Sequence, residues 1–378
     1  MRILALSNCP LQDSLGSGYV ALRYAAGLRA AGHHVDLLGP EDYEPFHRLF
    51  PGRGVSYRQE LGMAAAALRR AAGGRYDVVE LCGAQGWLAM RLLSALPGRR
   101  FLVVQRSNGL EPHYEEAMRA AEAAGLAPER RWFHLSQSRL FAAALRRADG
   151  LITVSAWDRD YALAHGYGPS ERVLALENPL PDSYLGQEIE PESPPRPRVI
   201  GYCGSWLPVK GVDLLIRALP PLLRELPAWR LALVGVGGEL RAADHFPADV
   251  LPRIDVVPFA DRETRLRDLY RGFAVTILPS IYESFGLAAA EAMACGSALV
   301  ATRVGFAAGL RHREEAFLLP ERSAAALQSA VRELAANEEL RRAVACGGHR
   351  RVQELRWDRT AGGLATAYAA WHSEWSAR

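Results

Sequence analysis

Lysine is almost absent from this sequence of 378 residues. Lys210 is the only lysine among 45 basic residues, so the other 44 (45 minus 1) are arginines. A composition this rich in Arg, Ala and Gly indicates coding pressure against lysine, so a retained lysine can mark a position that needs a compact ammonium. Lys210 follows an apolar run and precedes a helical pattern, beside Gly211, which suits contact with an anionic oxygen such as a phosphate. Chance retention is the alternative.

Other absences exclude several classes of protein. The five cysteines form no CxxC pair, which argues against a zinc knuckle or a disulfide scaffold and favours a reducing compartment. The ten histidines show no HxxxH or HExxH spacing, so we expect no catalytic metal. Residues 1–6 predict a first strand rather than a secretion signal, and no uncharged apolar run reaches the length of about 20 residues that spans a bilayer. We therefore expect a cytoplasmic protein.

Composition places the chain among globular proteins of more than one domain. Hydrophobic residues make up 49% and charged residues 23%, and the net charge of +3 is too small and too evenly spread to indicate a nucleic-acid partner. A chain of this length exceeds the usual size of one domain, about 100 to 200 residues. Two domains, each with a large buried core, are predicted.

Short β-type runs alternate with helical patterns from end to end, which is typical of α/β architecture with parallel sheets. The strands predicted in the first half are 2–6, 35–38, 76–81, 101–105 and 150–154, and those in the second half are 199–202, 230–234, 254–258, 274–278 and 298–302. The proline-rich stretch 191–197 favours an extended linker between the halves. The prediction is two Rossmann-like, doubly wound domains that face a central cleft, with ligands bound beyond the carboxyl ends of the strands.

The densest group of candidate site residues lies in 278–296, which follows a strand and opens a helix. Ser284 is predicted to cap this helix, leaving the backbone N–H groups of Phe285, Gly286 and Leu287 to meet an anion at the helix N-terminus. Glu283 precedes the helix and Glu291 lies about two turns later. Their carboxylates can accept hydrogen bonds from ligand hydroxyls. Two glutamates at this spacing alone would more often be a solvated helix face.

This segment resembles the EX7E signature of glycosyltransferase family 4. Seven residues separate Glu283 from Glu291, within Pro-Ser-Ile-Tyr-Glu-Ser-Phe-Gly-Leu and Glu-Ala-Met-Ala-Cys-Gly. The resemblance implies the GT-B fold, with a nucleotide-sugar held in the C-terminal domain. It further implies that Glu291 holds the ribose of the donor, Glu283 the transferred sugar and Lys210 the diphosphate. Transfer with retention of configuration, by a metal-independent enzyme of hexosyltransferase type, is the reaction that the family implies.

The resemblance extends over nearly the whole chain. Gly16-Ser17-Gly18 matches the glycine loop of the family's first βα turn, which adds these three residues to the predicted donor site, although such glycine pairs also occur in many turns for geometric reasons. Val304-Gly305 begins the second glycine turn. The last helix, from about Asp358, resembles one that crosses back to the N-terminal domain. The domains implied are 1–188 for the acceptor, 198–357 for the nucleotide-sugar, and the crossing helix 358–378.

Three departures from the family pattern affect this site. Ser205 stands where an arginine usually accompanies the lysine on the diphosphate, and Asn108 stands where a histidine commonly lies near the sugar and acceptor. An amide at Asn108 can donate and accept hydrogen bonds but cannot take up a proton as imidazole does, so we expect it to act in catalysis by hydrogen bonding. Phe306 and Gly309 replace a glycine and a glutamate. Arg106 and Arg303 are the candidates for restoring the missing positive charge.

Two further patterns have competing interpretations. Asp158-Arg159-Asp160 has the DxD form of a metal-nucleotide site, but its position after Ser155 favours the acidic start of a helix. The stretch 129–147 mixes arginines with apolar residues; docking on the core is favoured over contact with the inner face of a membrane. The acceptor is predicted to be a glycan, a lipid-linked glycan or a small molecule. A nucleotide-sugar epimerase or hydrolase, or a catalytically impaired binding partner, is the alternative function.

Overall fold

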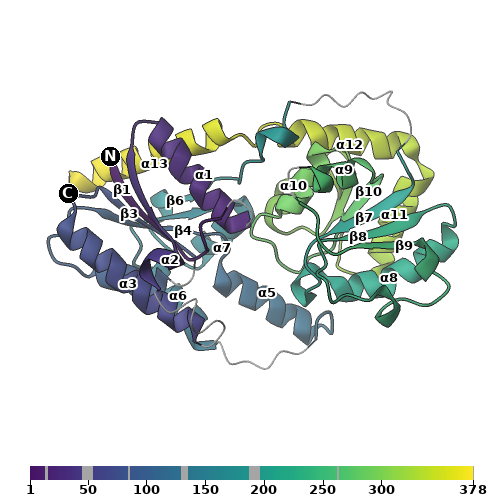
Figure 1. The fold of residues 1–378 in the computed structure, drawn as a ribbon, viewed down its shortest axis with the longest axis horizontal. Helices are drawn as coiled ribbons and strands as arrows, with labels where there is room; N and C mark the ends of the chain where they lie inside the picture. The colour runs from purple at the N-terminus through teal and green to yellow at the C-terminus, as the bar shows by residue number, and fades with distance from the viewer. Residues whose placement is uncertain are drawn as a thin grey trace. The chain divides into compact units, whose positions relative to one another are not determined.

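The computed structural model describes residues 1–12, 16–44, 54–83, 86–128, 135–186, 196–261 and 264–377. They form two compact units, each built on a parallel sheet of six strands. The first unit takes 1–115, 131–179 and 357–378, and the second takes 116–130 and 180–356. Figure 1 shows the sheets in purple to blue and in teal to green. The predicted α/β class with two doubly wound parallel sheets is confirmed.

The first sheet has the strand order β2-β1-β3-β4-β5-β6. Its strands are β1 (Arg2–Ser7), β2 (His34–Leu38), β3 (Val78–Cys82), β4 (Leu102–Arg106), β5 (Gly150–Thr153) and β6 (Val173–Ala175). Its helices are α1 (Gly16–Ala30), α2 (Pro40–Tyr43), α3 (Val55–Gly73), α4 (Trp87–Ser94), α6 (Leu135–Leu145) and α7 (Ala156–Ala164), and α5 (Glu111–Ala123) runs from the first unit into the segment grouped with the second.

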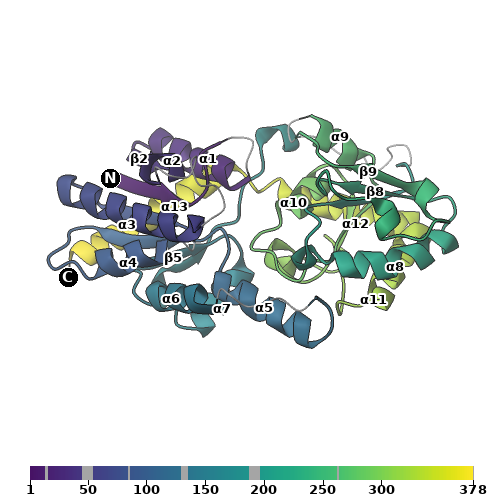
Figure 2. The same ribbon diagram turned by 60° about the horizontal axis from the view of Figure 1, so that its bottom comes forward.

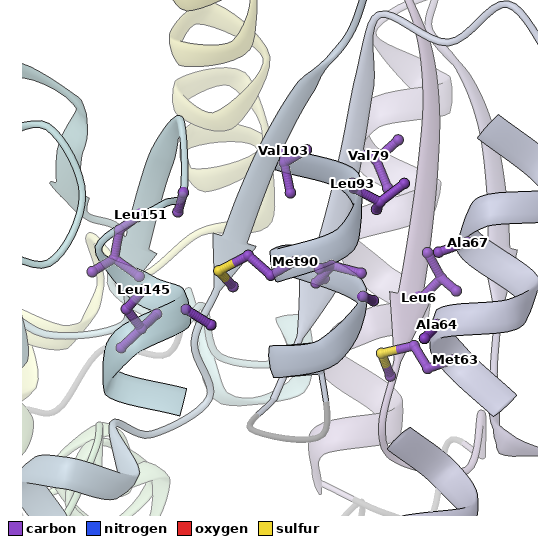
Figure 3. Packing of buried hydrophobic residues seen from close by; sticks show 14 of the residues in the cluster. Leu6, Met63, Ala64, Ala67, Val79, Met90, Leu93, Val103, Leu145 and Leu151 are labelled. Carbon is purple, nitrogen blue, oxygen red and sulfur yellow. The ribbon is translucent and has the colours of Figure 1, made fainter. Parts of the chain in front are cut away.

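Alternation along the strands gives this sheet two apolar faces. Leu4, Leu6, Val79, Leu81 and Val103 pack against α3, α4 and α6 in the core of Figure 3. The residues between them, such as Ile3 and Val78, pack against α1 and α13 (Trp357–Ser376). Successive side chains of a strand point to opposite faces, and both faces of this sheet are covered by helices. Every residue of the central strands β3 and β4 is therefore buried.

The C-terminal helix α13 lies beside α1 on the first sheet (Figure 1). Its Tyr368 hydroxyl donates a hydrogen bond to the buried carboxylate of Glu80, which also accepts from Arg106 Nε at 2.8 Å. Burial tends to raise the pKa of Glu80, but the Arg106 charge and these hydrogen bonds hold it below its usual value. The Arg106 guanidinium stacks over the Tyr24 ring at 4.4 Å. Arg106 is therefore part of a buried ion pair, and the idea that it restores charge at the donor site is wrong.

The second sheet has the strand order β12-β11-β10-β7-β8-β9. Its strands are β7 (Val199–Cys203), β8 (Arg230–Val234), β9 (Ile254–Val257), β10 (Val275–Leu278), β11 (Ala298–Ala301) and β12 (Phe317–Leu318), and its helices are α8 (Val212–Glu225), α9 (Arg265–Arg271), α10 (Leu287–Ala294), α11 (Ala324–Ala336) and α12 (Glu338–Val352). Helix α8 packs beside α11, as Figure 2 shows, and α10 packs against α9 and α12. The central strands β7 and β10 pair in parallel, so the loops that follow them leave the same edge of the sheet.

Every strand that the sequence predicts is present, whereas β6 and β12, of three and two residues, were not predicted. Gly32 follows α1 with a φ of 86°, as a helix C-terminal glycine requires. Most of the predicted linker 191–197, and 129–134 of the arginine-rich stretch, lie outside the described residues. The described part of that stretch includes α6, whose Phe141 and Leu145 are buried in the first core, which confirms core docking. Within the ranges described, no helix combines the length and apolar character needed to cross a membrane.

Candidate active site

Two loops of the second unit meet at the carboxyl ends of β7 and β10. After β7 the chain turns through a short 3-10 helix, Pro208–Lys210, and enters α8 at Gly211. Gly211 has a φ of 76°, and a Cβ there would lie 2.1 Å from the Pro279 carbonyl oxygen, so only glycine allows this close approach. The Ile281 N–H donates to the Val209 carbonyl at 2.8 Å. The two loops are thus held together by backbone contacts.

This approach brings Lys210 and Glu283 together. The Lys210 ammonium lies 2.8 Å from both carboxylate oxygens of Glu283. The Ser280 hydroxyl donates to Glu283 Oε1, also at 2.8 Å. The Lys210 side chain is 29% exposed and the Glu283 side chain 18% exposed, so the pair is partly buried yet accessible to a ligand. An ammonium and a carboxylate so placed can contact an anion and a sugar hydroxyl, respectively.

The start of α10 differs from the prediction in its cap. The N-cap position is held by Gly286, with a φ of 93°, and not by the predicted Ser284. The left-handed Gly286 lets the chain enter α10 at Leu287 while the Phe285 carbonyl accepts from the Phe306 N–H at 2.8 Å. The backbone of Phe285, Gly286 and Leu287 thus forms the turn that joins Glu283 to α10.

The second glycine turn packs directly on this loop. Gly305 has a φ of 56°, and a Cβ there would lie 2.6 Å from the Phe285 carbonyl oxygen and 2.8 Å from that of Glu283. The rings of Phe306 and Phe285 are 5.1 Å apart, so the phenylalanine that replaces the family's glycine packs behind the site. Arg303 is exposed, and its charge helps to lower the pKa of His312, after the larger effect of partial burial.

Glu291 lies deeper than Glu283. It is 2% exposed, and the Tyr270 hydroxyl donates to its Oε2 at 3.4 Å. Burial raises the pKa of Tyr270 well above its usual value, and the Cys203 and Glu291 charges raise it further. Ser205 is exposed in the loop after β7, and its carbonyl accepts from the Tyr202 hydroxyl at 2.9 Å. Sequence reasoning named Glu291 and Ser205 as candidates but did not single out Tyr270 and Tyr202, which contact them, or Ser280, which contacts Glu283.

The other candidates lie in the first unit. Gly16, Ser17 and Gly18 form the first turn of α1; a Cβ at Gly18 would lie 2.2 Å from the Pro10 carbonyl oxygen, so close backbone packing accounts for that glycine. Asn108 follows β4 and is half-buried.

Asp158 lies in the first turn of α7, where its backbone N–H donates to Oγ of the N-cap Ser155 at 3.3 Å. Its carboxylate Oδ1 lies 2.8 Å from His113 Nδ1. The helix-start interpretation of the DxD pattern is confirmed. Among the residues described, no three His, Cys, Asp or Glu side chains cluster as metal ligands would.

Comparison with known proteins decides the family. Residues 16–179 match the model of the glycosyl transferase 4-like domain, and residues 197–337 match that of the glycosyl transferases group 1. A D-inositol 3-phosphate glycosyltransferase from Jonesia denitrificans is 30% identical over 322 residues, which cover 78% of this chain and 72% of that protein. The chain belongs to the group 1 glycosyl transferases. A similarly named protein from Rhodococcus opacus is 34% identical, but the match covers 46% of this glycosyltransferase and 41% of that protein.

Solved structures show that this glycosyltransferase has the GT-B fold. Sucrose-phosphate synthase from Thermosynechococcus elongatus matches with a TM-score of 0.77 at 21% identity, over 99% of each chain. The catalytic domain of starch synthase IV from Arabidopsis thaliana, bound to ADP and acarbose, matches with a TM-score of 0.68 at 16% identity, over 100% of this chain and 99% of that one. Anabaena Alr3699/HepE in complex with UDP and glucose has the same TM-score and identity, over 98% and 100%.

Proposed function

We propose that this glycosyltransferase moves a sugar from a nucleoside diphosphate sugar to an acceptor hydroxyl, with retention of anomeric configuration. The observation that carries the proposal is the Lys210–Glu283 pair, which sets an ammonium beside a carboxylate at the carboxyl edge of the second sheet. A diphosphate and the sugar attached to it need these two groups at adjacent positions. Complexes of two structural neighbours with UDP and with ADP support a nucleoside diphosphate as the common part of the donor.

The proposed catalysis is electrostatic. Departure of the diphosphate leaves an oxocarbenium-like sugar, and negative charge grows on the phosphate oxygens. Lys210 and the N–H groups at the start of α10 stabilise that charge. Glu283 binds the transferred sugar and Glu291 the ribose, while Ser205 and the turn Gly16-Ser17-Gly18 contribute further donor contacts.

The departing phosphate oxygen takes the acceptor proton, so the bond to the acceptor forms on the face from which the diphosphate leaves. No enzymic base is required, which fits Asn108, whose amide can only hydrogen-bond the substrates. No metal ion is part of the proposed reaction, because the charge on the diphosphate is met by Lys210 and backbone N–H groups.

The test has two stages. UDP-, GDP-, ADP- and TDP-sugars are first ranked by the rise that they cause in the melting temperature of the full chain, since a ligand that binds only the folded form stabilises it. The best donor is then incubated with and without an acceptor panel that includes D-inositol 3-phosphate, which the curated relatives' name suggests. Transfer only with acceptor, and an α-to-α or β-to-β outcome by NMR, supports the proposal. Donor breakdown without acceptor favours a hydrolase or epimerase, and binding without any transfer favours an impaired binding partner.

A further inference from the structure

Arg322 lies in the turn between β12 and α11 and makes three hydrogen bonds with one guanidinium. Its Nε donates to the Pro279 carbonyl at 3.1 Å, its Nη1 to the Leu126 carbonyl at 2.9 Å and its Nη2 to Asp213 Oδ1 at 2.7 Å. The side chain is only 10% exposed. A buried guanidinium is costly unless its donors are satisfied, so this arrangement of acceptors is a built feature of the second unit.

Two of the three acceptors are at the bases of the loops that form the candidate site. Pro279 directly follows β10 and precedes Glu283 by four residues. Asp213 lies in the first turn of α8 and follows Lys210 by three residues. One guanidinium therefore connects the loop that bears the carboxylate to the helix start that follows the ammonium.

The connection lies at the point where the two loops touch. The Pro279 carbonyl oxygen that accepts from Arg322 is also the atom that a Cβ at Gly211 would meet, at 2.1 Å. Asp213 is held on both sides, with Oδ2 accepting from Arg217 at 2.7 Å and Oδ1 from Arg322. The third acceptor, Leu126, belongs to the segment 116–130 that is grouped with this unit. Displacing Arg322 would remove one hydrogen bond from each of the three segments.

We propose that Arg322 is a positioning residue for the diphosphate site: it fixes the spacing of the two loops and thereby the separation of Lys210 from Glu283. The inference rests on the proposed function, because it assumes that this pair binds the donor. A displacement of catalytic groups by about 1 Å can cost up to about a hundredfold in activity. Arginine is needed because its planar fork reaches three acceptors in fixed directions, whereas a lysine ammonium has no such fixed geometry.

The experiment compares Arg322→Ala and Arg322→Lys with Arg341→Ala as a matched control. Arg341 is also 10% exposed and also donates to a carbonyl, that of Leu334 at 3.0 Å, but it lies in α12 and contacts neither loop. Isothermal titration measures the dissociation constant of the full chain for UDP, GDP, ADP and TDP, and urea unfolding measures stability separately. For the nucleotide that wild type binds most tightly, Arg322→Ala is expected to raise the dissociation constant by about tenfold or more. Arg322→Lys is expected to raise it by less. Arg341→Ala is expected to lose stability while keeping wild-type affinity.

The inference would be overturned if Arg322→Ala bound the nucleotide within twofold of wild type, or if it lost no more nucleotide affinity than Arg341→Ala does. If Arg322→Ala does not fold, Asp213→Asn is measured instead, because it removes the charge that holds Arg322 with little change in side-chain volume. This variant should also bind the nucleotide more weakly than wild type. Lys210→Met separates the two claims. If it leaves nucleotide affinity unchanged, the proposed donor site itself is wrong. If it abolishes binding while the Arg322 and Asp213 variants bind as wild type does, only the positioning role is wrong.

Discussion

Replacing Glu283 by glutamine should change nucleotide affinity and transfer in opposite directions. The Glu283 carboxylate holds the Lys210 ammonium through two contacts of 2.8 Å. A diphosphate that binds there must compete with the Glu283 carboxylate, which is also negatively charged, for the Lys210 ammonium. Glutamine keeps the size of the side chain and its Ser280 contact but removes the charge. The ammonium then becomes available to the diphosphate without competition.

The size of the gain follows from the exposure of the pair. Exposed ion pairs are worth about 0.2 to 1 kcal/mol, and fully buried ones cost about 3 to 5 kcal/mol to break. Side chains that are 29% and 18% exposed lie between these two limits, and we take the upper end of the exposed range, about 1 kcal/mol, as the minimum. That corresponds to about fivefold tighter binding of a nucleoside diphosphate. Repulsion between Glu283 and the phosphates acts in the same direction. Transfer should fall, because the sugar loses a hydrogen-bonding carboxylate.

Isothermal titration with the nucleoside diphosphate that binds wild type most tightly checks the expected gain in affinity. The transfer assay then checks the expected fall in rate. Glu225→Gln is the matched control, since it changes the net charge equally but breaks an exposed pair with Arg332 at the end of α8. It should leave affinity and transfer unchanged. Equal or weaker nucleotide binding by Glu283→Gln would refute the idea that the carboxylate competes with the diphosphate for Lys210.

Three further outcomes are expected. Tyr368→Phe removes the hydroxyl that donates to buried Glu80, so urea unfolding should show a loss of about 1.5 to 3 kcal/mol; an unchanged midpoint would argue against this contact. Burial raises the pKa of Glu60 from 4.5 to about 8, so the folded state retains a proton that the unfolded state releases. Stability from this group is full below pH 4.5 and is lost as pH rises through 8, with a slope of up to about 1.4 kcal/mol per pH unit; Glu60→Gln should flatten that slope, and a stability that rises with pH there would contradict it. Transfer should persist in EDTA because Lys210 meets the diphosphate charge; a rate lost in EDTA and restored by Mg²⁺ or Mn²⁺ would show otherwise.

The strands could be predicted from the sequence because each central strand is a short, mainly apolar run that alternates with a helical pattern. Each of the ten predicted strands overlaps an observed one, with ends that differ by up to two residues. The two strands that it missed, β6 and β12, contain three and two residues at the sheet edges, too few to show a period. The strand prediction failed only at these two strands, where the pattern was too short to carry information.

The sequence predicted the two charged residues of the candidate site but not the residues that hold them in place. Lys210 stood out by its rarity and Glu283 by its surroundings, and the structure brings them into contact across 73 residues of sequence. The predicted N-cap was displaced from Ser284 to Gly286, because Gly286 takes a left-handed conformation that a cap rule for Ser does not consider. Arg106 was misjudged because its partner Glu80 lies 26 residues earlier, on a neighbouring strand.

The role of Arg322 could not be predicted from the sequence. Its acceptors are 43, 109 and 196 residues away along the chain, and nothing in the local sequence distinguishes it from the other arginines. Contacts of this kind depend on sheet order and loop packing, which local patterns do not specify. They become visible only when the three segments are seen together.

The most direct test of the account is the affinity of the full chain for a nucleoside diphosphate before and after Lys210→Met. Titration of both proteins with UDP, GDP, ADP and TDP should show micromolar or tighter binding of at least one by wild type and a loss of about tenfold or more in the variant, since a charge-assisted contact of about 1.5 to 3 kcal/mol disappears. Equal affinity of the two proteins for every nucleotide that binds would contradict the claim that this single lysine holds the diphosphate.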